Sequence, residues 1–328
     1  MANPGWPHAA SPFHGGERAI QARLGILERM DRQGRHVIRD YMPEQHRQFF
    51  AQLPYVMVGT VDGDGQPWAS ILVGEPGFMS APDERTLHIA AQPLFGDPLA
   101  NHLAQGGDIG LLGIELHTRR RNRMNGTIQA VDASGMAVAV GQSFGNCPQY
   151  IQARRFDLQG FAPTRPRPRH ALTILGPAER AMISAADTFF IATAYRAASA
   201  GAASGVDVSH RGGHPGFVRI DDAHTLTVPD FSGNGHFNTF GNLELNPRAG
   251  LLFLDFERGD LLYLTGTAEV LWEGDEIGQY PGAERLLRFH LHRGERVEGS
   301  LPPGWSAPEV SPFLDATGPW PEPDQNPN

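Results

Sequence analysis

The sequence predicts a mainly β protein with flanking helices, built from two copies of one antiparallel β-rich unit. Short apolar runs alternate with glycine, aspartate and proline turns, and landmark motifs of the first half return in the second half. Helical periodicity is confined to a few segments. Short strands at this spacing favour an antiparallel barrel or sandwich over a parallel βαβ sheet.

Composition limits the classes to which the chain can belong. Its 328 residues suffice for two ordinary domains with substantial cores. Apolar residues make up 40% and charged residues 19%, which is typical of a globular chain. The formal charge of -9, from 27 basic and 36 acidic residues, argues against a nonspecific nucleic-acid coat. Any anion site is therefore expected to be local.

Cysteine usage and the N-terminus indicate a compartment. The single cysteine, Cys147, excludes an internal disulfide framework and a multi-thiolate metal site within one chain. Residues 1–12 lack a basic segment followed by an apolar run, and the longest apolar region, 189–206, is interrupted by Arg196 and by glycines. We therefore expect a cytoplasmic protein without a nucleic-acid or membrane partner.

The segment before the first strand is expected to be an arm followed by two helices. Residues 1–16, rich in Pro, Gly and His, predict a loosely held arm. Apolar residues at helical spacing from position 17 predict one amphipathic helix that ends near Gly34. A second helix is expected over residues 43–51.

The first copy opens with a predicted hairpin. Residues 55–61 form a β-branched run, the Asp-Gly-Asp-Gly sequence at 62–65 is a strong turn signal, and residues 68–73 would form the returning strand. The remaining strands of this copy are expected at residues 86–90, 109–116, 124–131 and 136–140.

A linker rich in proline and arginine separates the copies. In residues 162–169, each proline biases its predecessor away from the α region, so the segment should be extended. The expected division of the chain is an N-terminal arm and helix at 1–40, a first barrel at 41–160, the linker at 161–180, a second barrel at 181–299, and a Pro-rich C-terminal tail at 300–328.

The second copy repeats the landmarks of the first at a shift of 139 (213 minus 74) or 140 (250 minus 110) residues. A nearly constant shift over this length indicates a tandem duplication that forms a pseudo-symmetric pair. The matched motifs are Gly-x-Pro-Gly-Phe at 74–78 and 213–217, Thr-Leu at 86–87 and 225–226, Gly-Leu-Leu at 110–112 and 250–252, and Gly-Thr at 126–127 and 266–267. The second copy should then continue with a helix over 283–287 and a strand over 288–292.

Residues 207–255 contain a candidate binding segment that reads as strand, polar glycine-rich loop, short helix and strand. Glycines and small polar residues allow backbone N–H groups to approach an anion, and Asn238 resembles an N-cap that opens the helix toward the loop. We interpret the segment as a phosphate cradle. An ordinary turn followed by a capped helix is the alternative interpretation of the local pattern.

Comparison of the copies separates shared scaffold from residues particular to one copy. At the shift of 140, four hydrogen-bond donors correspond to uncharged residues at 259, 261, 263 and 265. These donors are Arg119, Arg121, Arg123 and Asn125. Alternation along a strand would place all four on one face, where they would suit a phosphate or carboxylate; a solvated edge strand is the alternative. The polar loop 232–236 has a more apolar counterpart at 93–96, so the cradle belongs to the second copy.

These motifs resemble the pyridoxamine 5'-phosphate oxidase-like family of FMN-binding split barrels. In the second copy the resemblance lies in residues 187–193, 206–217 and 241–253, and in the first copy it lies in Trp68-Ala69-Ser70 and residues 119–126. It covers roughly residues 40–300. The family implies two tandem split β-barrels that form a pseudo-dimer, with FMN in the groove between them.

The resemblance also implies which residues would hold the cofactor. The family's phosphate-gripping strand and the loop that opens a short helix both fall on polar residues of the second copy. These residues are Ser209, His210 and Arg211 for the strand, and Asn238, Thr239 and Asn242 for the loop. The lysine usual in the loop is absent, which leaves a deazaflavin (F420), a haem or no cofactor as alternatives to FMN. The first copy's arginine strand would reach across the interface to the flavin or to an anionic substrate.

The leading hypothesis is therefore an FMN-dependent oxidoreductase that acts on a small-molecule substrate or an electron donor such as NAD(P)H. A homodimer of the whole chain is also expected. Flavin chemistry often needs no dedicated acid or base, so no catalytic side chain is assigned. The alternatives are a noncatalytic flavin or haem carrier, and a tandem barrel whose site has become an interaction surface.

Other candidate residues are interpreted as structural. The pairs His210 with His214 and His290 with His292 have spacings that a metal could use, but without a third ligand no metal site is expected. Cys147 is expected to be a packed thiol. Trp68 and Tyr55 are expected to be core aromatics rather than stacking partners of an isoalloxazine ring.

Overall fold

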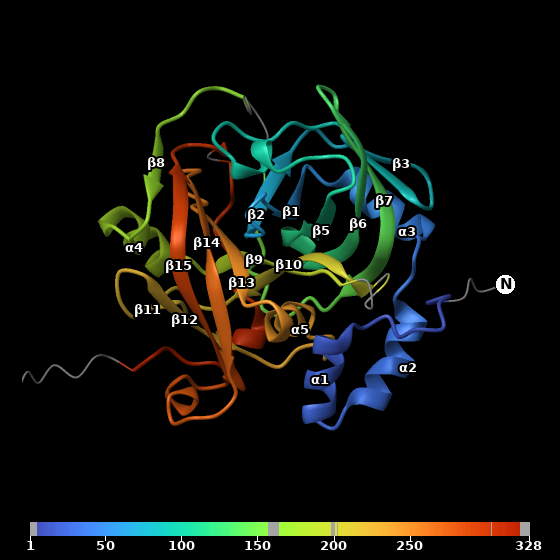
Figure 1. The fold of residues 1–328 in the computed structure, drawn as a ribbon. Helices are drawn as coiled ribbons and strands as arrows, with labels where there is room; N and C mark the ends of the chain where they lie inside the picture. The colour runs from blue at the N-terminus through green and yellow to red at the C-terminus, as the bar shows by residue number, and fades with distance from the viewer. Residues whose placement is uncertain (1–4, 157–163, 198–200, 202, 303, 322–328) are drawn as a thin grey trace, which may run out of the picture.

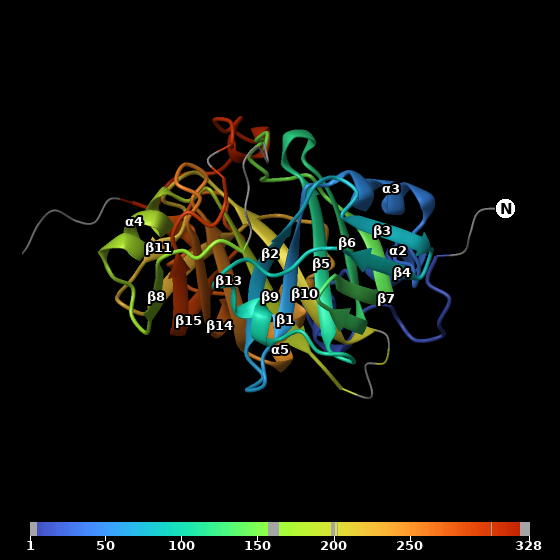
Figure 2. The same ribbon diagram turned by 90° about the horizontal axis from the view of Figure 1, so that it is seen from above.

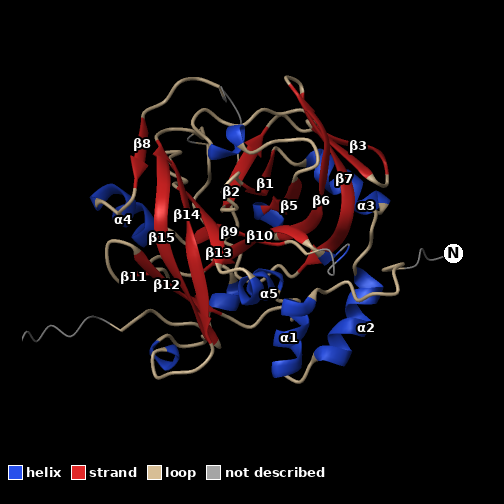
Figure 3. Cartoon of the chain, in the orientation of Figure 1, coloured by secondary structure: helices blue, strands red, loops and turns tan. Residues whose placement is uncertain are grey.

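The computed structural model describes residues 5–156, 164–197, 201, 203–302 and 304–321. Two antiparallel sheets stand side by side and account for most of the molecule, while the helices lie at its periphery (Figures 1, 2 and 3). The expectation of a mainly β protein with flanking helices is confirmed. Among the described residues, no helix combines the length and apolarity needed to cross a bilayer.

The first sheet has seven strands in the order β2-β1-β5-β6-β7-β4-β3. Its strands are β1 (Tyr55–Val61), β2 (Pro67–Val73), β3 (Met79–Asp83), β4 (Thr86–Ile89), β5 (Asp108–Glu115), β6 (Arg120–Asp132) and β7 (Gly135–Asn146). The predicted hairpin of β1 and β2 is confirmed, and Asp62 caps its turn by accepting hydrogen bonds from the backbone N–H groups of Asp64 and Gln66. The sequence pattern missed β3 and predicted β6 and β7 shorter than they are.

The second sheet has eight strands in the order β10-β9-β13-β14-β15-β12-β11, with β8 added against β15. Its strands are β8 (Arg169–Leu172), β9 (Thr188–Tyr195), β10 (Gly205–Gly212), β11 (Arg219–Ile220), β12 (Thr225–Asp230), β13 (Arg248–Leu254), β14 (Leu261–Leu271) and β15 (Arg285–Val297). Apart from β8, each strand has a counterpart at the same place in the first sheet. The two split barrels thus share one topology.

Strand register supports the duplication at single-residue resolution. Gly110 of β5 lies opposite Asn125 of β6, and Gly250 of β13 lies opposite Thr265 of β14. Both β6 and β14 shift register directly after that residue, at Gly126 and Gly266. A Cβ atom on Gly126 or on Gly266 would lie 2.0 Å from a backbone oxygen of the neighbouring strand, so each bulge requires glycine.

The barrels meet backbone to backbone at equivalent glycines. A Cβ atom on Gly110 would lie 2.5 Å from the carbonyl oxygen of Val206, and one on Gly250 would lie 2.3 Å from that of Pro67. Each barrel therefore presses a central strand against an outer strand of the other. The two contacts are related by the same pseudo-symmetry as the strands.

A methyl group at this contact should destabilise the pseudo-dimer. We expect Gly250→Ala to lower the free energy of unfolding by about 1–3 kcal/mol, because backbone atoms of the other barrel must move away. Gly278→Ala is the matched control, since nothing lies within 4 Å of its Cβ position. Urea unfolding of both variants measures the difference, and equal stability would contradict the proposed role of the contact.

The five α-helices of the described chain are α1 (Gly15–Arg23), α2 (Leu27–Val37), α3 (Glu44–Gln52), α4 (Pro177–Ala185) and α5 (Asn238–Leu245). The prediction of one continuous helix from position 17 to Gly34 is wrong. The chain instead turns at Gly25, which has a φ of +69°, and the helical stripe is divided between α1 and α2. The helix predicted at 43–51 is confirmed as α3.

The prediction of a loosely held arm is wrong for the described residues 5–14. Trp6, Phe13 and His14 are all buried. Phe13 packs so closely on α2 that a Cβ atom on Gly34 would lie 2.4 Å from its ring. Isolated aromatic residues among prolines and glycines have no periodicity, so their packing left no signal in the sequence pattern.

The predicted helix at 283–287 is also wrong, because β15 runs without interruption from Arg285 to Val297. Leu287, Phe289 and Leu291 are buried, whereas His290 and His292 are exposed, which is the alternation of a half-buried strand. The helix-favouring leucines misled the prediction because strand pairing on both sides of β15 outweighs local propensity.

Within the expected linker at 161–180, residues 164–168 lack regular structure, β8 begins at Arg169 and α4 begins at Pro177. Residues 157–163, which include the start of the segment expected to be extended at 162–169, lie outside the described residues. In the expected tail, residues 304–321 are mostly irregular but include a short 3-10 helix at Pro312–Leu314 and a bridge between Ala153 and Glu309. The end of the tail, 322–328, also lies outside the described residues.

Four apolar clusters form the core of the described residues, and one of them joins Trp6, Phe13 and α2 to Phe144 at the periphery. Of the other three, one fills each barrel, and one lies between the barrels. Tyr55 and Trp68 belong to the cluster between the barrels, so the expectation that they are core aromatics is confirmed.

Candidate functional site

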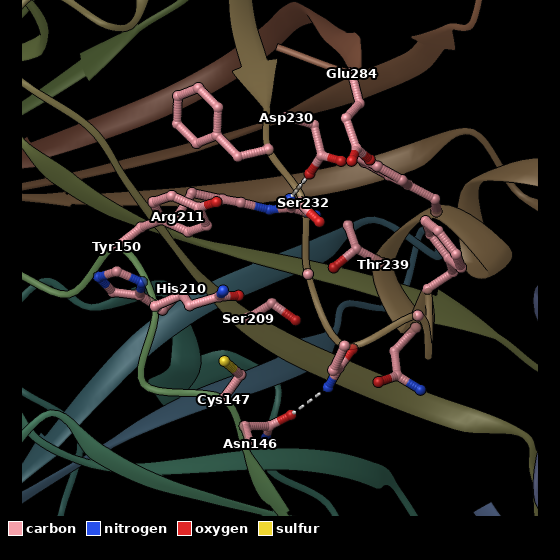
Figure 4. A pocket seen from close by; sticks show the side chains of 18 of the residues that line it. Asn146, Cys147, Tyr150, Ser209, His210, Arg211, Asp230, Ser232, Thr239 and Glu284 are labelled. Carbon is pink, nitrogen blue, oxygen red and sulfur yellow. Dashed lines mark hydrogen bonds and ion pairs between the residues drawn. The ribbon is translucent and has the colours of Figure 1, made fainter. Parts of the chain in front are cut away.

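A cavity of about 520 Å³ lies where the two barrels and the N-terminal helices meet. The first barrel contributes β6 and the segment that follows β7, and the second barrel contributes β10, the end of β12, the loop 232–235 and the start of α5. Helix α2 supplies a further wall. Figure 4 shows side chains from these elements converging on the space.

Positive charge is concentrated in this cavity. Its walls carry five arginines and two acids, although the whole chain has a formal charge of -9. The arginines are Arg29, Arg121, Arg123, Arg211 and Arg285, and the acids are Asp230 and Glu284. The expectation of a local anion site is consistent with this distribution.

The structure brings seven of the ten sequence-predicted site residues into the cavity wall. These seven are Arg121, Arg123, Ser209, His210, Arg211, Asn238 and Thr239. The other three, Arg119, Asn125 and Asn242, do not line it. Their positions explain why.

Arg119 lies outside the predicted strand face. It adopts a left-handed backbone conformation, with φ of +59°, and β6 begins only at the next residue. Its guanidinium binds the carbonyl oxygen of Ile151 at 3.0 Å and the carboxylate of Glu309 at 2.9 Å. The predicted row of four donors on one strand face is therefore wrong, because Arg119 instead holds the C-terminal segment.

Asn125 and Asn242 bind the protein's own carboxylate, Asp207, from opposite barrels. Arg123 lies 2.7 Å from Asp207 Oδ1, Asn125 Nδ2 donates to the same oxygen at 2.6 Å, and Asn242 Nδ2 donates to Oδ2 at 3.1 Å. The arginine strand thus does reach across the interface. At Arg123 and Asn125, however, its partner is Asp207.

Arg121 of β6 lines the cavity and forms no ion pair with an acidic residue of the described chain, so its charge is available to a ligand. Its Nε donates to the carbonyl oxygen of Cys147 at 2.5 Å, and no carboxylate lies within ion-pair distance among the described residues. Burial, with smaller contributions from Arg123 and Arg211, lowers the pKa of Arg121 to about 10, so the side chain remains charged at neutral pH. A half-buried cation without an acidic partner is electrostatically suited to an anionic ligand.

His210 presents a neutral imidazole to the same cavity. Its side chain is buried, and Nε2 has no hydrogen-bond partner among the described residues. Burial first, and then the charges of Arg121, Arg211 and Arg154, hold the pKa of His210 well below its ordinary value. The ring can therefore donate or accept a hydrogen bond without gaining a charge.

Arg211 is less available to a ligand than the sequence suggested. It forms an ion pair with Asp230, and Arg285 also binds Asp230, at 2.9 Å. The guanidinium lies 4.8 Å from the centre of the Phe240 ring. Asp230 therefore holds two arginines at the cavity wall, and an anion bound there would share them with this carboxylate.

The glycine-rich loop and α5 provide uncharged donors. A Cβ atom on Gly233 would meet nothing within 4 Å, so the backbone there is open. The N-cap of α5 is Phe237, in a left-handed conformation with φ of +61°, and no side chain caps the helix. The prediction of Asn238 as the N-cap is wrong, since Asn238 is the first helical residue and its side chain donates to Glu17.

The N-terminal helices hold the loop in place, which the sequence analysis missed. Gln21 of α1 donates to the carbonyl oxygens of Gly235 and His236, both at 3.4 Å, and a Cβ atom on Gly235 would lie 3.0 Å from the sulfur of Met30. The amphipathic stripe was the available signal, but a stripe shows that a face is buried without showing what covers it.

Tyr150, Phe231, Asp230 and Arg285 were also missed as cavity residues. Tyr150 lies three residues after Cys147, in a segment whose thiol was its only candidate group in the sequence. Asp230 and Arg285 meet as an ion pair between β12 and β15, strands that are not adjacent in sequence. Only the tertiary pairing of the strands brings these charges together.

The position that the pseudo-symmetry relates to the cavity is filled by the protein's own side chains. Ser70 and Tyr263, the counterparts of Ser209 and Arg123 at shifts of 139 and 140, both donate to the buried carboxyl group of Asp97, at 2.7 and 3.2 Å. Leu94 and Trp68 pack beside them. The two halves therefore share a scaffold but have a cavity at one position and a closed core at the other.

The first barrel is similar in sequence to a known family. Residues 42–170 match the model of the pyridoxamine 5'-phosphate oxidase family. This part of the chain is similar to that family. The matched residues contain the whole first sheet, and the second sheet, which lies almost entirely outside the match, repeats its strand order.

Solved structures resemble parts of this chain at low identity. HupZ from Group A Streptococcus is 20% identical over 34% of this chain and 84% of its own chain, with a TM-score of 0.26. A FAD-binding protein from Mesorhizobium loti is 14% identical over 39% of this chain and 97% of its own chain, also with a TM-score of 0.26. No curated protein sequence matches the chain significantly.

Proposed function

We propose that this protein binds FMN in the cavity between its barrels and acts as a flavoprotein oxidoreductase on a small molecule, with an electron donor such as NAD(P)H. The observation that carries the proposal is Arg121, a half-buried arginine that lines the cavity without a carboxylate partner among the described residues. The similarity of residues 42–170 to the pyridoxamine 5'-phosphate oxidase family supports a flavin as the anionic ligand.

The residues of the cavity fit a phosphorylated flavin. The cavity volume of about 520 Å³ falls within the range of roughly 300–1,000 Å³ that small-molecule sites occupy. The open backbone at Gly233, the uncapped start of α5 and the hydroxyl of Thr239 offer uncharged donors to a phosphate. Aromatic side chains, among them Tyr150 and Phe231, offer apolar surface to a ring. The donors at Gly233, at the start of α5 and at Thr239 would together take the place of the lysine that the loop lacks.

A bound flavin would supply the two-electron chemistry, and the protein would supply position and charge. Arg121 would bind a negative group of the ligand, and the neutral His210 would form a hydrogen bond without adding charge. Ser209, which receives a hydrogen bond from Arg123, lies at the junction of the two barrels and would orient the ligand between them. No side chain is assigned as a proton donor or acceptor in the reaction.

The visible spectrum of the purified protein, as isolated and after addition of FMN, tests this proposal. We expect a flavin spectrum that NAD(P)H bleaches without air and that air restores. A protein that is colourless and cannot be reconstituted would refute the proposal. A Soret band would assign the cavity to haem, and retention of a deazaflavin in preference to FMN would assign it to that cofactor.

Titration should give one FMN per chain. The second pseudo-symmetric position is filled by Asp97, Tyr263 and their neighbours, so only the charged cavity can accept the ligand. Flavin absorbance after gel filtration, divided by the protein concentration from amino-acid analysis, measures the ratio. A ratio near two would contradict the closed position.

The homodimer, the cytoplasmic location and the absence of nucleic-acid and membrane partners stay predictions. Sedimentation equilibrium of the flavin-loaded protein would test the dimer.

A further inference from the structure

Tyr150 has an unusual backbone conformation at the edge of the cavity. Its φ is +62°, in the left-handed region that residues other than glycine rarely adopt. Such a conformation costs roughly 1–2 kcal/mol and persists where the surroundings impose it, often at functional sites. The residue lies in the segment that leads from β7, which ends at Asn146, toward the second barrel.

Two contacts hold Tyr150 in this conformation. A Cβ atom on Gly212 would lie 2.1 Å from the Tyr150 carbonyl oxygen, so a glycine at the end of β10 is required for their approach. The ring packs on Phe231, with centroids 4.9 Å apart and an interplanar angle of 38°. Both the backbone and the ring are therefore positioned by the second barrel.

The polar end of Tyr150 is free for a ligand. Tyr150 and Phe231 both line the cavity, and the side chains drawn in Figure 4 place Tyr150 beside Arg211 and His210. The Tyr150 hydroxyl has no hydrogen-bond partner among the residues that the structure describes. Burial, followed by the charges of Glu284 and Asp230, raises the pKa of Tyr150, so the phenol stays neutral and can donate a hydrogen bond.

We propose that the ring of Tyr150, supported by Phe231, is the surface on which the flavin ring stacks, and that its hydroxyl donates a hydrogen bond to the ligand. This inference rests on the proposed function, since it assigns a positioning residue to the same cavity. A purely structural tyrosine would not need an unpartnered hydroxyl beside a charged cavity. The strained backbone instead fixes the ring where a planar heteroaromatic ligand would meet it.

The test compares FMN binding and the fluorescence of bound FMN in three variants. Tyr150→Leu removes the ring, Tyr150→Phe removes only the hydroxyl, and Phe313→Leu is the control. Phe313 contacts Tyr150 at 6.1 Å between ring centroids but does not line the cavity. A stacked tyrosine quenches flavin emission, and packing elsewhere in the protein does not, so fluorescence separates stacking from a structural role.

We expect Tyr150→Leu to weaken FMN binding roughly three- to tenfold and to brighten the bound flavin several-fold. Tyr150→Phe should keep the quenching while it weakens binding about two- to tenfold, because one hydrogen bond is lost. Phe313→Leu should match the parent in both measurements. If Tyr150→Leu does not fold, Phe231→Leu tests the same surface from its other side and should show the same brightening.

Parent affinity and parent quenching in Tyr150→Leu would overturn this inference and leave the proposed function intact. Equal losses in Tyr150→Phe and Tyr150→Leu, with quenching unchanged, would also overturn the stacking. A parent protein that binds no FMN would refute the proposed function itself.

Discussion

The Arg121→Met variant is expected to bind FMN roughly 10- to 100-fold more weakly than the parent, because hydrogen bonds to a charged group contribute about 1.5–3 kcal/mol. The cavity would lose a half-buried cation that has no acidic partner among the described residues. Fluorescence titration of the apoprotein with FMN measures the affinity.

The same variant should be more stable than the parent in the absence of ligand. A half-buried charge without an acidic partner carries a desolvation cost, which methionine at position 121 would remove. A fall in affinity together with a rise in thermal stability would identify Arg121 as a binding residue and not as a structural one.

Arg119→Met provides the matched control. Arg119 lies two residues away, but it binds Ile151 and Glu309 and does not line the cavity. The Arg119→Met substitution should leave FMN affinity unchanged. Equal losses of affinity in both variants would indicate a general disturbance of β6, and parent affinity in Arg121→Met would place the anion elsewhere.

The second large effect concerns Asp97, whose buried carboxyl group should make folding depend on pH. Burial raises the pKa of Asp97 to about 7, although hydrogen bonds from Leu99, Ser70 and Tyr263 oppose the shift. At acid pH the carboxyl is protonated in both states. Between about pH 4 and pH 7 the unfolded chain loses the proton while the folded protein keeps it, so stability should fall as the pH rises and level off above pH 7.

The expected size of this loss is on the order of 4 kcal/mol, since the pKa is raised by about three units. Asp97→Asn should abolish it, because an amide can keep hydrogen-bond partners without ionising. Urea unfolding of parent and variant at pH 5 and pH 8 should measure about 3 kcal/mol of this loss, the part that falls above pH 5, as a double difference in which other groups such as Glu17 cancel. Parallel pH dependence of the two proteins would contradict the assignment.

The duplicated scaffold could be predicted from the sequence because its critical positions are glycines that both copies need. Gly110 and Gly250 make the closest approaches between the barrels, and Gly126 and Gly266 form equivalent bulges. A position with no space for a side chain holds glycine in both copies, so the requirement is visible as sequence identity between them. Strand periodicity and the Asp-Gly turn supplied most of the remaining fold.

The site was only partly predictable, because residue type does not reveal a partner. Arg121 and Arg123 look alike in sequence, but the structure pairs Arg123 with Asp207 and leaves Arg121 facing the cavity. Arg119 was misplaced because the strand begins one residue after it. Tyr150 was not recognised, since its backbone conformation and its contact with Phe231 arise only from tertiary packing.

A crystal structure of the protein grown with FMN would show directly where the flavin binds. We expect one flavin per chain, in the cavity between the barrels, in contact with Arg121 of the first barrel and with the loop 232–235 and α5 of the second. Flavin density at the position around Asp97 and Tyr263, or in the cavity without any contact to Arg121, would contradict it.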